Sequence, residues 1–200
     1  MNIALFGGSF DPIHNGHVQL SQVFRDKLSL DKTIIMPAAV SPFKQDKKAA
    51  SGEHRYNMCR LAFEDRSDTE VSDLELMRQG TSYTYMTLQQ LAQQYPTDRL
   101  YLITGADMFL SVDRWKTPDI IFKTAVICGI PRNSDNIPSL EAQSEKLKAL
   151  GAETVILDAH IMTVSSTEVR RRIACGEDIS DLVPEKVAGY IYENGLYTQP

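Results

Sequence analysis

The amino-terminal stretch 6–17, Phe-Gly-Gly-Ser-Phe-Asp-Pro-Ile-His-Asn-Gly-His, constrains the fold more than any other part of the chain. It follows the apolar run Asn2–Phe6, which predicts a buried strand, and it precedes the helical pattern of residues 16–28. Glycines that leave a strand let the backbone approach a ligand closely, because they carry no Cβ atom. At a helix start, His14 and His17 lie on the same face. A strand, a glycine turn and such a helix together favour phosphate binding.

This turn differs from the two best-known phosphate-binding loops. A P-loop has Lys and then Ser or Thr after its second glycine, and that pair is missing here. The dinucleotide-binding fingerprint G-x-G-x-x-G is missing from the turn as well. The sequence therefore predicts a phosphate-binding turn of another class.

Apolar, β-branched runs alternate with helical patterns along the chain. The expected strands are Ile3–Phe6, Thr33–Met36, Glu70–Ser72, Leu100–Thr104, Ala125–Cys128 and Thr154–Leu157. The expected helices cover residues 16–28, 53–65, 84–95, 140–150, 166–174 and 184–194. Short strands separated by helices predict an α/β fold, a Rossmann-like doubly wound parallel sheet with helices on both faces.

The predicted architecture also indicates where a ligand would bind. Ligands of such sheets lie beyond the carboxyl ends of the strands, near the point where the strand order reverses. The glycine turn follows the first strand and therefore falls in that region. We expect a single domain over residues 1–200, with a short helical carboxyl-terminal part at about 163–200.

Composition narrows the class of protein. The three cysteines, Cys59, Cys128 and Cys175, are far apart, which argues against a disulfide framework or a zinc site. A strand follows Met1 directly, without a signal peptide pattern, and apolar runs such as Ala125–Ile130 are too short to span a bilayer. The net charge of −5 disfavours general nucleic-acid binding. We expect a soluble cytoplasmic protein without nucleic-acid or membrane partners.

A second motif, Val-Ser-Ser-Thr-Glu-Val-Arg-Arg-Arg at residues 164–172, predicts a helix start. Ser165 and Glu168 have the spacing of a capping box, and the free N–H groups of such a first turn attract anions. Arg170, one turn further on, can reach back to the same anion. The alternative is an ordinary surface helix with a solvated basic face.

The motifs G-G-S-F-D-P-x-H-x-G-H and S-S-T-x-x-R together resemble those of the H-x-G-H nucleotidyltransferase superfamily. Within it, the chain is similar to bacterial nicotinate-nucleotide adenylyltransferases. Further matching stretches cover nearly the whole chain: 36–38, 82–85, 105–107, the region of Trp115 and 194–197. The resemblance implies transfer of AMP from ATP to nicotinate mononucleotide, by direct in-line attack of the acceptor phosphate. The products are deamido-NAD, in NAD biosynthesis, and pyrophosphate.

The resemblance also implies roles for residues toward ATP. His14, His17 and Arg170 would be catalytic, by contacting the phosphates, and the imidazoles are expected in a protonated, doubly donating form. The other expected ATP contacts are Gly7, Gly8, Ser9, Phe10, Gly105, Asp107, Ser166 and Thr167. Mg²⁺ would be carried by the ATP phosphates, with no metal ligand from the protein. The alternatives are that one histidine, or Asp107, only caps a helix.

Four residues are expected to bind the acceptor, again through the resemblance. Trp115 would stack on the pyridine ring, whose positive charge favours an indole face. Tyr83 and Thr84 begin a predicted helix, where N–H groups could receive the nicotinate carboxylate. Lys44 could steer the acceptor phosphate. A buried core position for Trp115 and a plain helix start at residue 84 are the alternatives.

The chain departs from the family pattern at three places. Phe43 stands where the family often has His, which weakens the assignment of the acceptor phosphate. Met86 stands where Asp is frequent. The arginine that usually follows the strand at Ala125–Cys128 is displaced to Arg132, and no role is assigned to it.

Two other functions remain open from the sequence. The same adenylyl transfer could use nicotinamide mononucleotide or another phosphate-bearing acceptor. The chain could also be a non-catalytic nucleotide-binding module, although both motifs are present in full. The oligomeric state is left open.

Overall fold

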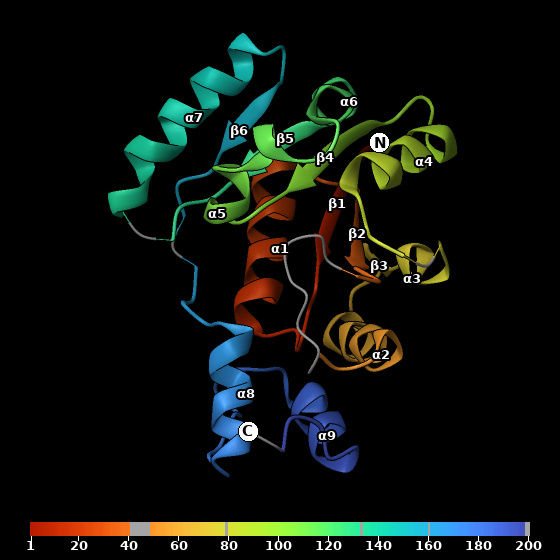
Figure 1. The fold of residues 1–200 in the computed structure, drawn as a ribbon, viewed down its shortest axis with the longest axis vertical. Coiled ribbons are helices and arrows are strands. Elements are labelled where there is room, and N and C mark those ends of the chain that lie inside the picture. Colours follow the sequence, from red (N-terminus) through yellow and green to blue (C-terminus); the bar gives the residue numbers. More distant parts are fainter. Residues whose placement is uncertain (41–48, 79, 133, 160, 199–200) are drawn as a thin grey trace.

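The computed structural model describes residues 1–40, 49–78, 80–132, 134–159 and 161–198. A parallel sheet forms its centre, with six strands in the order β3-β2-β1-β4-β5-β6 (Figure 1). The strands are β1 Asn2–Gly8, β2 Lys32–Pro37, β3 Thr69–Val71, β4 Arg99–Ile103, β5 Val126–Gly129 and β6 Thr154–Ile156. The strand order reverses between β1 and β4, which confirms the predicted doubly wound sheet.

The longer helices occupy their predicted positions. They are α1 Asn15–Leu28, α2 Gly52–Phe63, α4 Thr84–Gln94, α7 Ile137–Ala149, α8 Ser166–Ala174 and α9 Glu185–Glu193. The structure adds three short helices that the sequence did not predict: α3 Leu74–Arg78, α5 Ala106–Phe109 and α6 Pro118–Thr124. It also adds the 3-10 helices Val112–Arg114 and Ser134–Asn136. Elements this short complete too few turns to give a helical period.

Alternate residues of the central strands face opposite sides of the sheet. Ile3 and Leu5 belong to a buried cluster that includes side chains of α4, α6 and α7. Ala4 and Phe6 belong to a second cluster, with side chains of α1 and α2. Since neighbouring side chains of a strand point to opposite faces, one apolar run serves both clusters. Helices on both faces are therefore confirmed.

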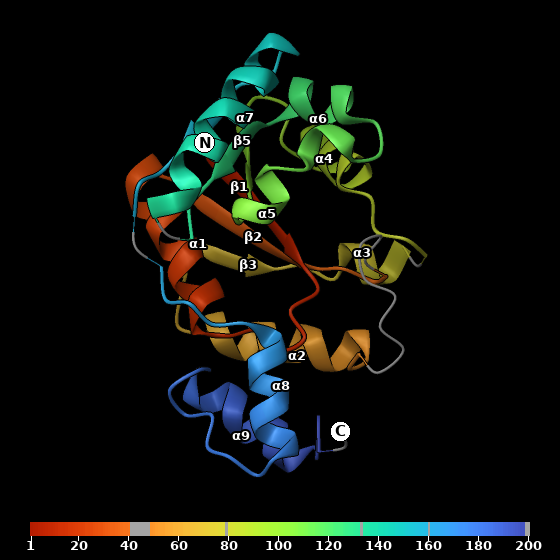
Figure 2. The same cartoon turned by 60° about the vertical axis from the view of Figure 1, so that its left-hand side comes forward.

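The carboxyl-terminal helices α8 and α9 lie below the sheet, and α9 packs beside α2 (Figures 1 and 2). Val169 of α8 and Val187 of α9 belong to the same cluster as Phe24 of α1. The carboxyl-terminal helices therefore share a buried cluster with α1, and one domain over residues 1–200 stays a prediction. No helix in the described part of the chain is long and apolar enough to cross a membrane.

Candidate active site

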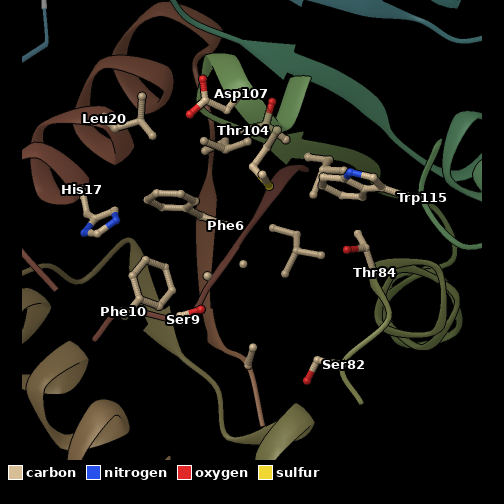
Figure 3. Close-up of a pocket in the computed structure, with 18 of the residues that line it drawn as sticks. Phe6, Ser9, Phe10, His17, Leu20, Ser82, Thr84, Thr104, Asp107 and Trp115 are labelled. Atoms are coloured by element: carbon tan, nitrogen blue, oxygen red, sulfur yellow. The ribbon is translucent and has the colours of Figure 1, made fainter. Parts of the chain in front are cut away.

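A cavity of about 380 Å³ opens at the carboxyl ends of β1 and β4, where the strand order reverses (Figure 3). Several predicted site residues line it: Gly7, Gly8, Ser9, Phe10, His17, Thr84, Gly105, Asp107 and Trp115. Figure 3 shows His17 and Trp115 at opposite ends of the cavity. The structure thus brings predicted contacts for both substrates into one pocket.

The two histidines are held by reciprocal backbone hydrogen bonds at the start of α1. The backbone N–H of His14 donates to Nδ1 of His17, and the N–H of His17 donates to Nδ1 of His14, both at 3.3 Å. The rings stack with their centroids 3.6 Å apart. Because each Nδ1 accepts, a neutral ring carries its proton on Nε2. His14 therefore caps α1, and the phosphate-binding role and the doubly donating form of the two imidazoles stay predictions.

The turn before the histidines is shaped by Phe10. Its backbone is left-handed (φ 47°), which is uncommon for a residue with a side chain. The buried Phe10 ring packs edge-on against His17, with 5.1 Å between centroids. A Cβ atom on Gly8 would come within 2.9 Å of this ring, so only glycine fits there without a shift. The Phe10 ring therefore packs between the glycine turn and the His17 ring.

The second motif docks onto the first. Ser166 Oγ donates to the carbonyl oxygen of Pro12 at 3.0 Å, and Arg170 Nη1 donates to that of Asp11 at 2.6 Å. Arg170 thus contacts the turn that leads to His14. Neither Arg170 nor His14 is among the described residues that line the cavity. Thr167 is exposed in the first turn of α8. The two motifs meet, as the sequence predicted.

The predicted capping box of α8 forms only in half. Ser165 Oγ accepts from the N–H of Glu168 at 3.1 Å. The Glu168 carboxylate, however, bonds to Arg171 and Arg172, which lower its pKa to about 2. Arg171 and Arg172 are thus paired with Glu168, whereas Arg170 contacts the main chain of Asp11 in the first motif.

Asp107 and Arg132 form an ion pair of 2.7 Å at the wall of the cavity, where both are exposed. Gly105, not Asp107, is the N-cap of α5, so the cap alternative for Asp107 is wrong. Sequence reasoning noted Arg132 only as displaced. Its position three residues after the end of β5 was the available signal, since strand ends border the ligand site in this fold.

At the other end of the cavity, Trp115 is half-buried, and its indole N–H donates to Ser111 Oγ at 3.2 Å. Its ring packs against the buried cluster that contains Ile3 and Leu5, and it also lines the cavity. The position of Trp115 is therefore intermediate between a buried core residue and an exposed rim residue. Tyr83 is the N-cap of α4 and makes no side-chain cap bond. Thr84 lines the cavity, whereas Lys44, with Phe43, lies outside the described residues.

Sequence reasoning missed Arg55, which is 5% exposed in the first turn of α2. Its guanidinium donates to the carbonyl oxygens of Ser9 at 2.8 Å, Ala50 at 3.1 Å and Ala39 at 3.3 Å. Burial lowers the pKa of Arg55, and the negative charge of Asp11 opposes that change. Arg55 thus fixes the main chain of the glycine turn at Ser9.

A second missed group is the buried Glu75, which lines the cavity. Thr87 donates its hydroxyl hydrogen to Glu75 Oε1 at 2.5 Å. Arg78 Nη2 donates to Thr87 Oγ1 at 2.9 Å and lies 3.8 Å from Glu75. This network joins α3 to the first turns of α4.

Comparisons with known proteins identify the family of this chain. The sequence model of the cytidylyltransferase-like family matches residues 5–172. A Clostridium tetani protein named "Probable nicotinate-nucleotide adenylyltransferase" is 37% identical, over 97% of this chain and 98% of its own. A Roseiflexus protein of that name is 40% identical, over 98% and 97%. The chain belongs to the nicotinate-nucleotide adenylyltransferase family.

Solved structures support the fold of this adenylyltransferase family member. The Plasmodium falciparum nicotinic acid mononucleotide adenylyltransferase complexed with APC has a TM-score of 0.78 at 19% identity, over 100% of this chain and 98% of that one. The same protein complexed with NaAD has a TM-score of 0.74 at 20% identity, over the same shares. The predicted Rossmann-like fold is thereby confirmed.

Proposed function

We propose that this protein transfers AMP from ATP to nicotinate mononucleotide, forming deamido-NAD and pyrophosphate in NAD biosynthesis. An oxygen of the acceptor phosphate attacks the α-phosphorus of ATP in line, while the bond from that phosphorus to the β-phosphate oxygen breaks. The meeting of the two motifs carries this proposal, since Arg170 contacts Asp11 only three residues before His14. Family membership and the pocket support it.

The phosphate end needs donors rather than a nucleophile, because the acceptor supplies its own. Nε2 of His14 and of His17 would donate to the phosphates, and Arg170 would add a guanidinium donor. Ser166 and Thr167 would offer first-turn N–H groups of α8 to the same polyphosphate. Donors aimed at the leaving pyrophosphate stabilise charge that grows during the reaction.

The rest of ATP would lie along the turn and α5. The main chain of residues 7–10 borders the cavity and can approach the nucleotide closely. Asp107, after Gly105, would accept from ribose hydroxyls. Its partner Arg132 would then share the carboxylate with the ribose.

The acceptor would lie at the opposite end of the cavity. Trp115 would stack on the pyridinium ring, and the first N–H groups of α4, next to Tyr83 and Thr84, would receive the nicotinate carboxylate. That geometry favours an acid over an amide at the ring. Lys44 stays proposed as a contact of the acceptor phosphate.

The side chains at the phosphate end suit a triphosphate that brings its own Mg²⁺. Guanidinium and backbone N–H groups donate to phosphate oxygens and do not bind a cation, and Nδ1 of each imidazole already accepts a backbone N–H. Two carboxylates of the proposed ATP site are engaged, Asp11 by Tyr197 and Asp107 by Arg132. When bound, Mg²⁺ would neutralise part of the phosphate charge.

An acceptor panel tests the function. Pyrophosphate release is measured with ATP and Mg²⁺ and, in parallel, with nicotinate mononucleotide, nicotinamide mononucleotide, phosphopantetheine, a sugar phosphate or no acceptor. We expect rapid release with nicotinate mononucleotide and background release without an acceptor. Faster turnover of another acceptor would reject the substrate assignment. ATP binding by calorimetry without turnover of any acceptor would reject the enzyme in favour of a binding module.

A further inference from the structure

The carboxylate of Asp11 joins parts of the chain that are far apart in sequence. Oδ1 accepts from the Tyr197 hydroxyl at 2.6 Å and from the backbone N–H of Ala50 at 3.0 Å. Asp11 is 6% exposed, in a turn whose neighbouring residues Phe10 and Pro12 are buried as well. A buried carboxylate is costly unless donors and positive charge surround it, so these contacts are part of what keeps it in place.

The same residue contacts Arg170 twice. Nη1 of Arg170 donates to the main-chain oxygen of Asp11 at 2.6 Å and lies 3.7 Å from carboxylate atom Oδ2. The guanidinium therefore meets both the backbone and the side chain of one residue. Two contacts from a single residue restrict the orientation of a long, flexible side chain more than either does alone.

The charges around Asp11 do not cancel. Arg170 lies on one side, and the buried Arg55 is close enough for the Asp11 charge to act on its pKa. One carboxylate thus faces two guanidinium groups. The excess is positive, which suits a turn that would receive a polyphosphate.

Tyr197 fixes the carboxylate from the carboxyl-terminal end of the chain. Burial, and then the charge of Asp11, raise the pKa of the Tyr197 hydroxyl, so it remains a neutral donor. Tyr197 also adopts a left-handed backbone (φ 63°), which needs compensating contacts. Figures 1 and 2 show this end of the chain beside α8 and α9.

The geometry points to Asp11 as a positioning residue whose carboxylate, anchored by Tyr197, fixes the Arg170 guanidinium at the phosphate-binding turn. This inference rests on the proposed function, in which Arg170 binds the phosphates. The carboxyl-terminal residues thereby become part of the support of the active site, rather than a passive tail.

A double-mutant cycle tests the inference on the full chain. Asp11→Asn keeps the shape of the side chain and removes its charge, and Arg170→Ala removes the guanidinium. Because a small misplacement of a catalytic group can cost about 100-fold, we expect each single variant to lower kcat by roughly 10- to 100-fold. If Asp11 acts through Arg170, Asp11→Asn should lower kcat by less than about twofold in the Arg170→Ala background.

Tyr197→Phe is the milder variant, in case Asp11→Asn folds poorly. We expect it to lower kcat about three- to tenfold, to leave the KM for the acceptor unchanged, and to lose that effect in the Arg170→Ala background. Tyr190→Phe is the matched control, since its hydroxyl bonds to His54 and Asn57 of α2, away from Asp11. It should lower the unfolding midpoint comparably and retain kcat.

The outcomes separate the two hypotheses. If Arg170→Ala lowers kcat and the effects of Asp11→Asn and Tyr197→Phe simply multiply with it, the positioning role is wrong and the proposed function stands. If kcat of Arg170→Ala is unchanged, the phosphate role of Arg170 fails and the inference fails with it. Equal loss of kcat in Tyr190→Phe would show a general stability effect and would also overturn the inference.

Discussion

The two ends of the pocket differ in what holds them in place. At the histidine end, formed by His17 and residues 9–12, cationic side chains donate to main-chain carbonyl oxygens. Arg55 reaches Ser9 from α2, and Arg170 reaches Asp11 from α8. These bonds fix the path of the backbone directly.

The tryptophan end, formed by Thr84 and Trp115, is held by bonds between side chains. The indole N–H of Trp115 donates to Ser111, and Thr87 donates to Glu75. These bonds depend on both partners, so a substitution on either side can reshape this end.

The difference suggests a division of labour within the proposed function. A rigid backbone with fixed donors suits stabilisation of a transition state, which needs preorganisation. An adjustable set of side chains suits selection of the acceptor. Substitutions at the histidine end should therefore change kcat, whereas those at the tryptophan end should change the KM for the acceptor.

The largest effect is expected for His17→Ala. Loss of one preorganised donor to developing charge costs about 3–4 kcal/mol, which corresponds to roughly 100- to 1,000-fold in kcat. Steady-state kinetics should show a much smaller change in the KM for the acceptor. His54→Ala is the control, because His54 contacts Tyr190 outside the pocket. An unchanged kcat in His17→Ala would contradict the role of the histidine end.

The fold was predictable because its four central strands, β1, β2, β4 and β5, are buried on both faces. A strand such as β2 therefore reads as a continuous β-branched and apolar run, Thr33–Met36, between Lys32 and Pro37. The helix α6 was not predictable, because it spans only Pro118–Thr124 and buries just Ile121 and Phe122. Its apolar pair is indistinguishable from the start of the following strand.

The site was predictable where a motif carries it, and not where tertiary contacts do. His17 and Arg170 lie in short patterns with a local physical meaning. Arg55 lies in the first turn of a helix and, in the sequence, looks like any surface arginine. Its burial depends on carbonyl groups of Ala39 and Ser9, which come near it only in the folded chain.

The next effect tests the support of the tryptophan end through Thr87. Thr87→Val keeps the shape but removes the donor to the buried Glu75, which should cost about 1–3 kcal/mol of unfolding free energy. Because α4 would shift, the KM for the acceptor should rise severalfold while that for ATP stays constant. Denaturant unfolding and kinetics measure both. Thr87→Ser keeps the hydroxyl and should retain both the unfolding free energy and the KM for the acceptor of the parent protein. If it did not, the hydrogen bonds of Thr87 would not be what supports acceptor binding.

A smaller effect is expected for Trp115→Ala. Loss of a cation–π contact is worth about 0.5–2 kcal/mol, so acceptor affinity should fall by roughly 2- to 30-fold. Calorimetry with the acceptor and with ATP separates the two ends of the pocket. Tyr192→Phe, exposed on α9, is the control for loss of an aromatic group's polar atom. Equal weakening of ATP would mean that the indole does not belong to the acceptor end alone.

The smallest effect is expected for Arg132→Gln, which removes the exposed ion pair with Asp107. Exposed pairs are worth about 0–1 kcal/mol, so ATP affinity should change by less than about fivefold. Added salt screens the ion pair and should therefore weaken ATP binding further in the parent protein only, because the variant lacks the pair. Asp107→Asn should have a larger effect, because it also removes the proposed acceptor of the ribose hydroxyls. Titration of ATP at low and high salt checks both variants. If Arg132→Gln weakened ATP as much as Asp107→Asn, Arg132 itself would contact the nucleotide, and the donors of the histidine end would extend across the cavity to β5.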